Sequence, residues 1–93
     1  DKYQIYTEKV LHLLENSEIR ALVDNRSEKT GRKIRDAEVS KIPFMLIVGE
    51  KEEKDGTVSV RRHGEGDKGT YSIKDFIALM NTEIEKTVIP FHN

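Results

Sequence analysis

The sequence predicts a single α/β domain over residues 1–93, in which a mixed β-sheet is flanked by helices. Three patterns support this fold class. Apolar residues recur at helical spacing over residues 3–14 and again after residue 72. The unbroken apolar run 44–48 is typical of a strand buried on both faces, and the alternating residues 57–61 indicate a half-buried strand. The predicted element order is α-β-α-β-β-α.

The first predicted helix and strand occupy residues 3–14 and 20–23. Five apolar side chains share one face of the helix: Tyr3, Tyr6, Val10, Leu13 and Leu14. Asn16 and Ser17 can end it. The short apolar segment 20–23 is followed by Asp24 and Asn25, which favours a buried strand ending in a turn.

The second predicted helix runs from a cap at Ser27 to about residue 40. Gly31, Ile34 and Ala37 form a narrow face of small residues that could pack closely on a sheet. Pro43 ends the helix, and the buried strand 44–48 follows. Two strands joined by a helix predict a parallel crossover.

The last third of the chain reads as a hairpin and a helix. Gly49 opens a predicted polar loop, and Asp55-Gly56 is a hairpin turn signal before an antiparallel strand over 57–61. Residues 63–69 are expected to form a loop. A capping box over residues 72–75 begins a helix that is expected to end near residue 87. Pro90 argues against a central strand over residues 88–91.

Composition excludes several kinds of function for the chain alone. Cysteine is absent, which excludes disulfides and thiolate chemistry. The three histidines have no metal-ligand spacing, and no nucleophile, base and orienting group are assembled. Residues 64–69 match G-x-G-x-x-G but lack the following parallel strand and acidic residue of a dinucleotide site. We therefore expect no catalytic residue, metal or cofactor in the chain, no membrane segment, and a cytoplasmic location.

The charge distribution points to a local phosphate-facing surface. The chain has a formal net charge of −1, yet residues 20–35 hold six basic and two acidic residues. Arg26, Arg32 and Lys33 are the candidate phosphate contacts. They would supply affinity for RNA without specificity for its sequence. Glu52 and Arg61 could supply that sequence specificity, because a carboxylate accepts hydrogen bonds from a guanine edge and a guanidinium donates them to base oxygens and nitrogens.

Four segments carry a resemblance to a known family: DNRSEKTGRKIR (24–35), IPFMLIVGEKE (42–52), TVSVRR (57–62) and DKGT (67–70). Together they resemble the C-terminal anticodon-binding domain of class II aminoacyl-tRNA synthetases. The group includes threonyl, prolyl, histidyl and glycyl enzymes, and the similarity is greatest to bacterial-type threonyl-tRNA synthetases. The resemblance covers nearly the whole chain.

The resemblance implies that the domain recognises the anticodon loop of tRNA(Thr), whose last two letters are G and U. Glu52 and Arg61 match the family's base-reading carboxylate and arginine, and Lys29 matches a lysine at a helix start on the anticodon loop. Ser27 stands where the family often has Asn, and Lys41 where Arg is common. Lys41 keeps the charge but loses the planar fork of arginine.

The resemblance also implies a three-layer fold whose first strand precedes residue 1, so the chain is expected to be a fragment of a longer synthetase. Either another chain or the segment 88–91 could then pair with the exposed sheet. The catalytic module, with ATP, Mg and Zn, would lie in the rest of the enzyme, which is expected to dimerise through that module. The fragment itself is expected to be non-catalytic.

Three alternatives remain from the sequence. The domain could belong to a prolyl-, histidyl- or glycyl-type synthetase. It could be a synthetase-like accessory module that binds protein and has no RNA specificity. An independent nucleotide-binding enzyme is the third alternative.

Overall fold

A five-stranded mixed sheet forms the centre of the computed structural model, which describes residues 4–22 and 28–92. Its strands are β1 (Arg20–Ala21), β2 (Phe44–Val48), β3 (Thr57–Arg62), β4 (Gly66–Ser72) and β5 (Thr87–His92). Their spatial order is β1-β5-β2-β3-β4. Strand β5 pairs parallel with both β1 and β2, whereas β3 pairs antiparallel with both β2 and β4. The predicted mixed sheet is confirmed, with two strands more than expected.

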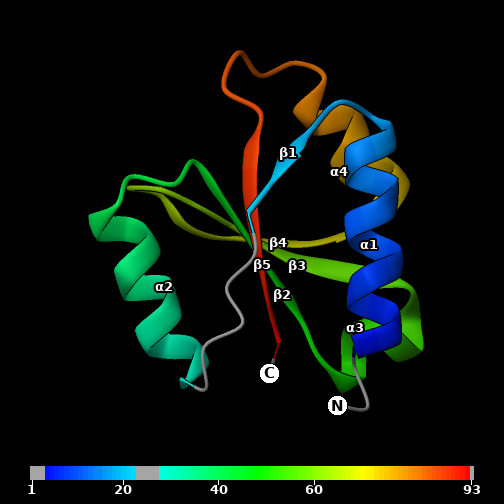
Figure 1. Ribbon diagram of the computed structural model, residues 1–93, viewed down its shortest axis with the longest axis horizontal. Coiled ribbons are helices and arrows are strands. Elements are labelled where there is room, and N and C mark those ends of the chain that lie inside the picture. Colours follow the sequence, from blue (N-terminus) through cyan, green and yellow to red (C-terminus); the bar gives the residue numbers. More distant parts are fainter. Residues whose placement is uncertain (1–3, 23–27, 93) are drawn as a thin grey trace.

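Helices cover both faces of the sheet, which gives three layers (Figure 1). Helix α2 (Thr30–Val39) lies on one side, and α1 (Gln4–Asn16) and α4 (Ile73–Met80) lie on the other. The short helix α3 (Glu50–Asp55) follows the end of β2. None of the helices in the described ranges is long and apolar enough to cross a membrane. The layered α/β prediction is therefore confirmed.

Two hydrophobic cores hold the layers together. The larger one packs α1 and α4 against the sheet, and in it the rings of Phe44 and Phe76 meet edge to face with centroids 6.1 Å apart. The smaller one packs Ala37 of α2 against Met45, Ile89 and Phe91. Because alternate residues of β2 enter different cores, this strand is buried on both faces, as the unbroken apolar run predicted.

Helix α1 ends in a turn that places a non-glycine residue in the left-handed region. Glu18 has φ 60, its N–H donates to Glu15 O at 3.1 Å, and the Ile19 N–H donates to Leu14 O at 3.0 Å. These are the two hydrogen bonds of a Schellman motif, in which glycine is preferred because it has no Cβ.

Glu18→Gly is therefore expected to raise the free energy of unfolding by about 0.5–1 kcal/mol, measured by urea denaturation. The matched control is Glu15→Gly, inside the same helix, which is expected to cost about 1 kcal/mol. Equal destabilisation by both changes would show that the left-handed conformation of Glu18 carries no strain.

Helix α2 begins later than predicted and packs through a different face. Lys29 occupies its N-cap position without a side-chain cap bond, and Ser27, the predicted cap, lies outside the described residues. Gly31, expected on the packing face, is exposed, whereas Lys33 is buried beside Ala37. The long aliphatic stem of a lysine can pack like an apolar side chain, which a pattern based on charge does not anticipate.

The segment after β2 forms helix α3, so the prediction of a polar loop is wrong. Residues 50–55 are mostly Glu and Lys, which are good helix formers. Three acidic residues lie in the first turn, where their negative charges interact favourably with the positive end of the helix dipole and stabilise the helix. Gly56 is the left-handed C-cap with φ 68. The Asp55-Gly56 signal therefore marks the end of a helix rather than a hairpin turn.

Strand β4 was predicted to be a loop. Its glycines and charged residues have low strand propensity, and most of its side chains are exposed. The strand forms because its backbone pairs with β3 along an edge of the sheet, with a bulge opposite Val60 and Arg61. Such pairing depends on the neighbouring strand and not on the local sequence.

The final helix is shorter than predicted. Ser72 accepts a hydrogen bond from Asp75 N at 3.1 Å, which confirms the predicted cap. The helix ends at Met80 rather than near residue 87, and Ile84, which lies within the residues predicted to be helical, is fully exposed. The Thr82 hydroxyl donates to Leu79 O at 2.7 Å, a local bond that competes with continued helix.

Strand β5 overturns the prediction that a proline excludes a central strand here. It lies between β1 and β2, and Pro90 is buried opposite Leu46. Val88 accepts from Leu22 N on the β1 side. Alternate residues of a parallel strand bond to the same neighbour, so the ring nitrogen of Pro90 faces the β1 side, beyond the last β1 pair at Ala21–Val88. Residues 88–91 pair with the sheet, which was one of the two possibilities considered from the sequence.

Candidate nucleic-acid interface

One face of β3 presents polar side chains to solvent. Val58 and Val60 point into the larger core, so Ser59 and Arg61 point to the opposite face, where both are partly exposed. Thr70 of β4 pairs with Ser59 and is exposed. We call the surface formed by Ser59, Arg61 and Thr70 the open face.

Glu52 reaches the open face from α3. Its residue is only 7% exposed, and its Oε2 accepts a hydrogen bond from the Ser59 hydroxyl at 3.1 Å. A carboxylate this deeply buried needs hydrogen-bond donors, because desolvation of the charge is costly. The sequence placed Glu52 at the end of a strand, whereas the structure places it in a helix whose carboxylate turns back onto the sheet.

Arg61 brings a donor to the same face. Its Nε is buried and has no hydrogen-bond partner among the described residues, and a Cβ built on Gly66 would lie 4.0 Å from its Nη2. A buried N–H without an acceptor costs about 1–3 kcal/mol. The open face therefore carries an acceptor, the Glu52 carboxylate held by Ser59, and a donor, Arg61, which follows Ser59 by two residues along β3.

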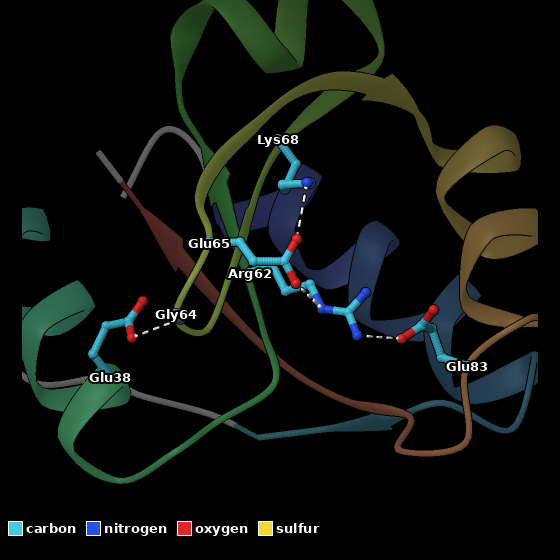
Figure 2. Close-up of polar contacts among 6 residues, drawn as sticks. All are labelled: Glu38, Arg62, Gly64, Glu65, Lys68 and Glu83. Carbon is cyan, nitrogen blue, oxygen red and sulfur yellow. Dashed lines mark hydrogen bonds and ion pairs between the residues drawn. The ribbon is translucent and has the colours of Figure 1, made fainter.

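The turn after Arg61 is anchored by the neighbouring arginine (Figure 2). Arg62 points to the other face, where its Nη2 lies 2.8 Å from Glu83 Oε1 and its Nε lies 3.0 Å from Glu65 Oε2. Its guanidinium also lies 5.1 Å from the centroid of the Phe44 ring. Because Arg62 is held at three points, the backbone that carries Arg61 is also held.

Two further contacts fix this turn. Lys68 Nζ donates to Glu65 Oε1 at 3.0 Å, and this hydrogen bond is the main cause that lowers the pKa of Glu65. On the other side, Gly64 N donates to Glu38 Oε2 at 3.2 Å, which ties the turn to the last turn of α2 (Figure 2). The β3–β4 turn thus has a defined position relative to both layers of helices.

The structure places Lys29 and Lys41 just beyond opposite ends of α2, a helix about 15 Å long. Both are exposed. The start of α2 and helix α3 lie at the end of the sheet where β2 finishes (Figure 1), so Lys29 shares that end with Glu52. Lys41 lies at the other end, in a left-handed conformation with φ 58.

The three candidate phosphate contacts differ in accessibility. Arg32 is exposed and pairs with Glu28 at 3.5 Å, a surface ion pair that an RNA phosphate can readily replace. Lys33 is only 5% exposed, so its side chain offers little surface to a phosphate in this conformation. Arg26, like Ser27, lies outside the described residues.

Comparison with known proteins shows the family of this chain. A family model described as an anticodon binding domain matches residues 1–83. The chain belongs to the anticodon binding domain family. The confirmed layers and mixed sheet fit this family, as the resemblance predicted.

Curated relatives of this anticodon binding domain are threonine–tRNA ligases. One from Flavobacterium psychrophilum is 62% identical over an alignment of 93 residues that covers 98% of the chain. Another from Bacteroides fragilis is 54% identical over 88 residues, or 95% of the chain, and one from Chloroherpeton thalassium is 51% identical over 84 residues, or 90%. The chain spans 14% of the length of the first two relatives and 13% of the third.

Ser59 was not among the residues predicted for this anticodon binding domain. The signal for it was the alternation along 57–61, which puts Ser59 on the same face as Arg61. Its contact with Glu52 could not be anticipated while residues 50–55 were expected to form a loop. Within residues 4–22 and 28–92, no cluster of His, Cys, Asp or Glu could hold a metal ion.

Tyr6 of α1 makes a hydrogen bond close to α3. Its hydroxyl donates to Thr57 O at 2.6 Å, which links α1 to the start of β3. Burial raises the pKa of Tyr6 above its ordinary 10.0, and the carboxylates of Glu52 and Glu53 add to this rise. Deprotonation would remove the donated hydrogen bond and place a new negative charge near those two carboxylates.

A pH prediction follows from this raised pKa. The stability that the neutral Tyr6 hydroxyl contributes is complete below pH 10.0, the unfolded value, and is lost as the pH rises through the higher folded value. Tyr6→Phe is expected to lower the free energy of unfolding by about 1 kcal/mol at neutral pH. Above pH 10, the free energy of unfolding of this variant is expected to fall less steeply than that of the wild type. Urea denaturation at several pH values measures both, and parallel curves for the two proteins would contradict the assignment.

Proposed function

We propose that this domain reads the anticodon of tRNA(Thr) as part of a threonine–tRNA ligase. The observation that carries the proposal is the meeting of Glu52 and Arg61 on the open face, one as a buried acceptor and the other with a buried donor that lacks a partner. The amino acid follows from the curated relatives, which are threonine–tRNA ligases.

Each proposed site residue has a distinct role. Glu52 accepts from the N–H groups of a guanine edge, and Arg61 donates to base oxygens or nitrogens. Lys29 binds the anticodon loop near the end of the sheet that also carries Glu52. Lys41 and Ser27 hold weaker contacts, and Arg26, Arg32 and Lys33 contact phosphates, with Lys33 needing to move from its buried position.

Catalysis belongs to the remainder of the ligase in this proposal. That part would hold ATP, Mg and Zn, would join threonine to the tRNA, and would form the dimer. The whole enzyme would work in the cytoplasm. The domain contributes the choice of tRNA and no reacting group.

Binding to a labelled tRNA(Thr) anticodon stem-loop, followed by fluorescence anisotropy, tests the proposal. We expect affinity to fall linearly on a logarithmic salt scale, with a slope set by the number of phosphates contacted. A stem-loop with the middle anticodon base changed from guanine to adenine is expected to bind more weakly. Equal binding of an unrelated stem-loop would overturn the proposed specificity and favour a protein-binding accessory module.

A further inference from the structure

The bond between Ser59 and Glu52 does more than join β3 to α3. A carboxylate on a side chain with several rotatable bonds can present its oxygens in many directions, and ordering it during binding costs entropy. The Ser59 hydroxyl holds Oε2 at 3.1 Å, while the Glu52 residue is 7% exposed. The carboxylate orientation is therefore set before any ligand arrives.

The carboxylate of Glu52 is not neutralised by a neighbouring cation in the described ranges. Its carboxylate makes no ion pair with any described residue, although Arg61 follows Ser59 by two positions on the same face. An ionised carboxylate has about four lone-pair sites, of which the Ser59 hydroxyl uses one. The Ser59 hydroxyl therefore leaves acceptor capacity on both oxygens.

We propose that Ser59 is a positioning residue that aims the Glu52 carboxylate at a base edge presenting two adjacent N–H donors. Among the bases this edge is that of guanine, whose N1–H and N2–H groups can meet the two oxygens together. Adenine presents an acceptor beside its single amino group, and the carboxylate repels that acceptor. The inference rests on the proposed function and adds the residue that sharpens the choice of base.

The fold alone does not require a hydroxyl at position 59. The side chain lies on the open face between partly exposed residues, where any strand-forming residue would maintain the pairing with Ile47 and Thr70. Ser59→Ala and Ser59→Thr therefore make a matched pair, because both preserve the strand and only the second keeps the hydroxyl. Circular dichroism of each variant checks that the fold is retained.

Anisotropy titrations use the 93-residue chain with anticodon stem-loops that carry guanine or inosine at the middle position. Inosine lacks the N2 amino group. Ser59→Ala is expected to weaken binding of the guanine stem-loop by about 3- to 10-fold, the effect of one hydrogen bond, and to reduce the preference for guanine over inosine. Ser59→Thr is expected to restore both.

A double-mutant cycle tests whether Ser59 acts through Glu52. In a Glu52→Ala background, Ser59→Ala is expected to cause no further loss. An equal loss in both backgrounds would overturn the positioning role, as would an unchanged guanine preference in Ser59→Ala alone. If the wild type itself does not prefer the tRNA(Thr) stem-loop, the proposed function fails and this inference fails with it. A wild-type preference with an unaffected Ser59→Ala variant removes only the inference.

Discussion

Glu52→Ala is expected to weaken binding of the tRNA(Thr) anticodon stem-loop by about 1–3 kcal/mol and to loosen discrimination at the middle base. The direction is informative, because removing a negative charge should by itself strengthen binding to a polyanion. Weaker binding by a variant whose circular dichroism shows a retained fold therefore indicates that the carboxylate accepts hydrogen bonds from the RNA. Titrations against guanine and adenine stem-loops at one salt concentration measure both effects.

One variant provides a control for this result, and a second tests the other half of the site. Glu53→Ala removes an exposed carboxylate from the same helix and is expected to leave affinity unchanged or slightly increased. Arg61→Ala is expected to lose about as much affinity as Glu52→Ala, since its guanidinium is the donor on the same face. If Glu53→Ala weakened binding as much as Glu52→Ala, the role of Glu52 as a base reader would be wrong.

Phe44→Ala is expected to lower the free energy of unfolding by about 3–5 kcal/mol, a large share of the stability of a small domain. Phe44 is 2% exposed, packs edge to face on Phe76, and lies under the Arg62 guanidinium. Truncation leaves a cavity at the centre of the larger core and removes the support beneath Arg62. Thermal or urea denaturation measures the loss.

Matched substitutions separate the ring from its volume. Phe44→Leu keeps most of the apolar volume and is expected to cost less than about 1.5 kcal/mol. Val39→Ala, at a residue that is 77% exposed, is expected to change stability by less than about 0.5 kcal/mol. A Phe44→Ala loss no larger than that of Val39→Ala would contradict the packing of this core.

Much of the candidate site could be predicted from residue type, and its geometry could not. Glu52 and Arg61 were expected to supply an acceptor and a donor, and the structure brings both to one face. The basic run of residues 20–35 suggested a continuous phosphate surface. Burial of Lys33 shows that a basic residue within this run need not join the surface formed by its neighbours.

The sequence by itself determined the helical faces of Tyr6, Val10 and Leu14, the cap at Ser72 and the doubly buried strand Phe44–Val48. These features depend on local periodicity and on apolar burial, which a short window of residues encodes. Only the tertiary structure decided the central place of β5, the pairing of β4 and the contact of Ser59 with Glu52. Each of these features depends on residues that are distant in sequence, or on helix α3, which was predicted to be a loop. Strand pairing and side-chain burial are stabilised by contacts with such distant residues, which a short window of sequence does not contain.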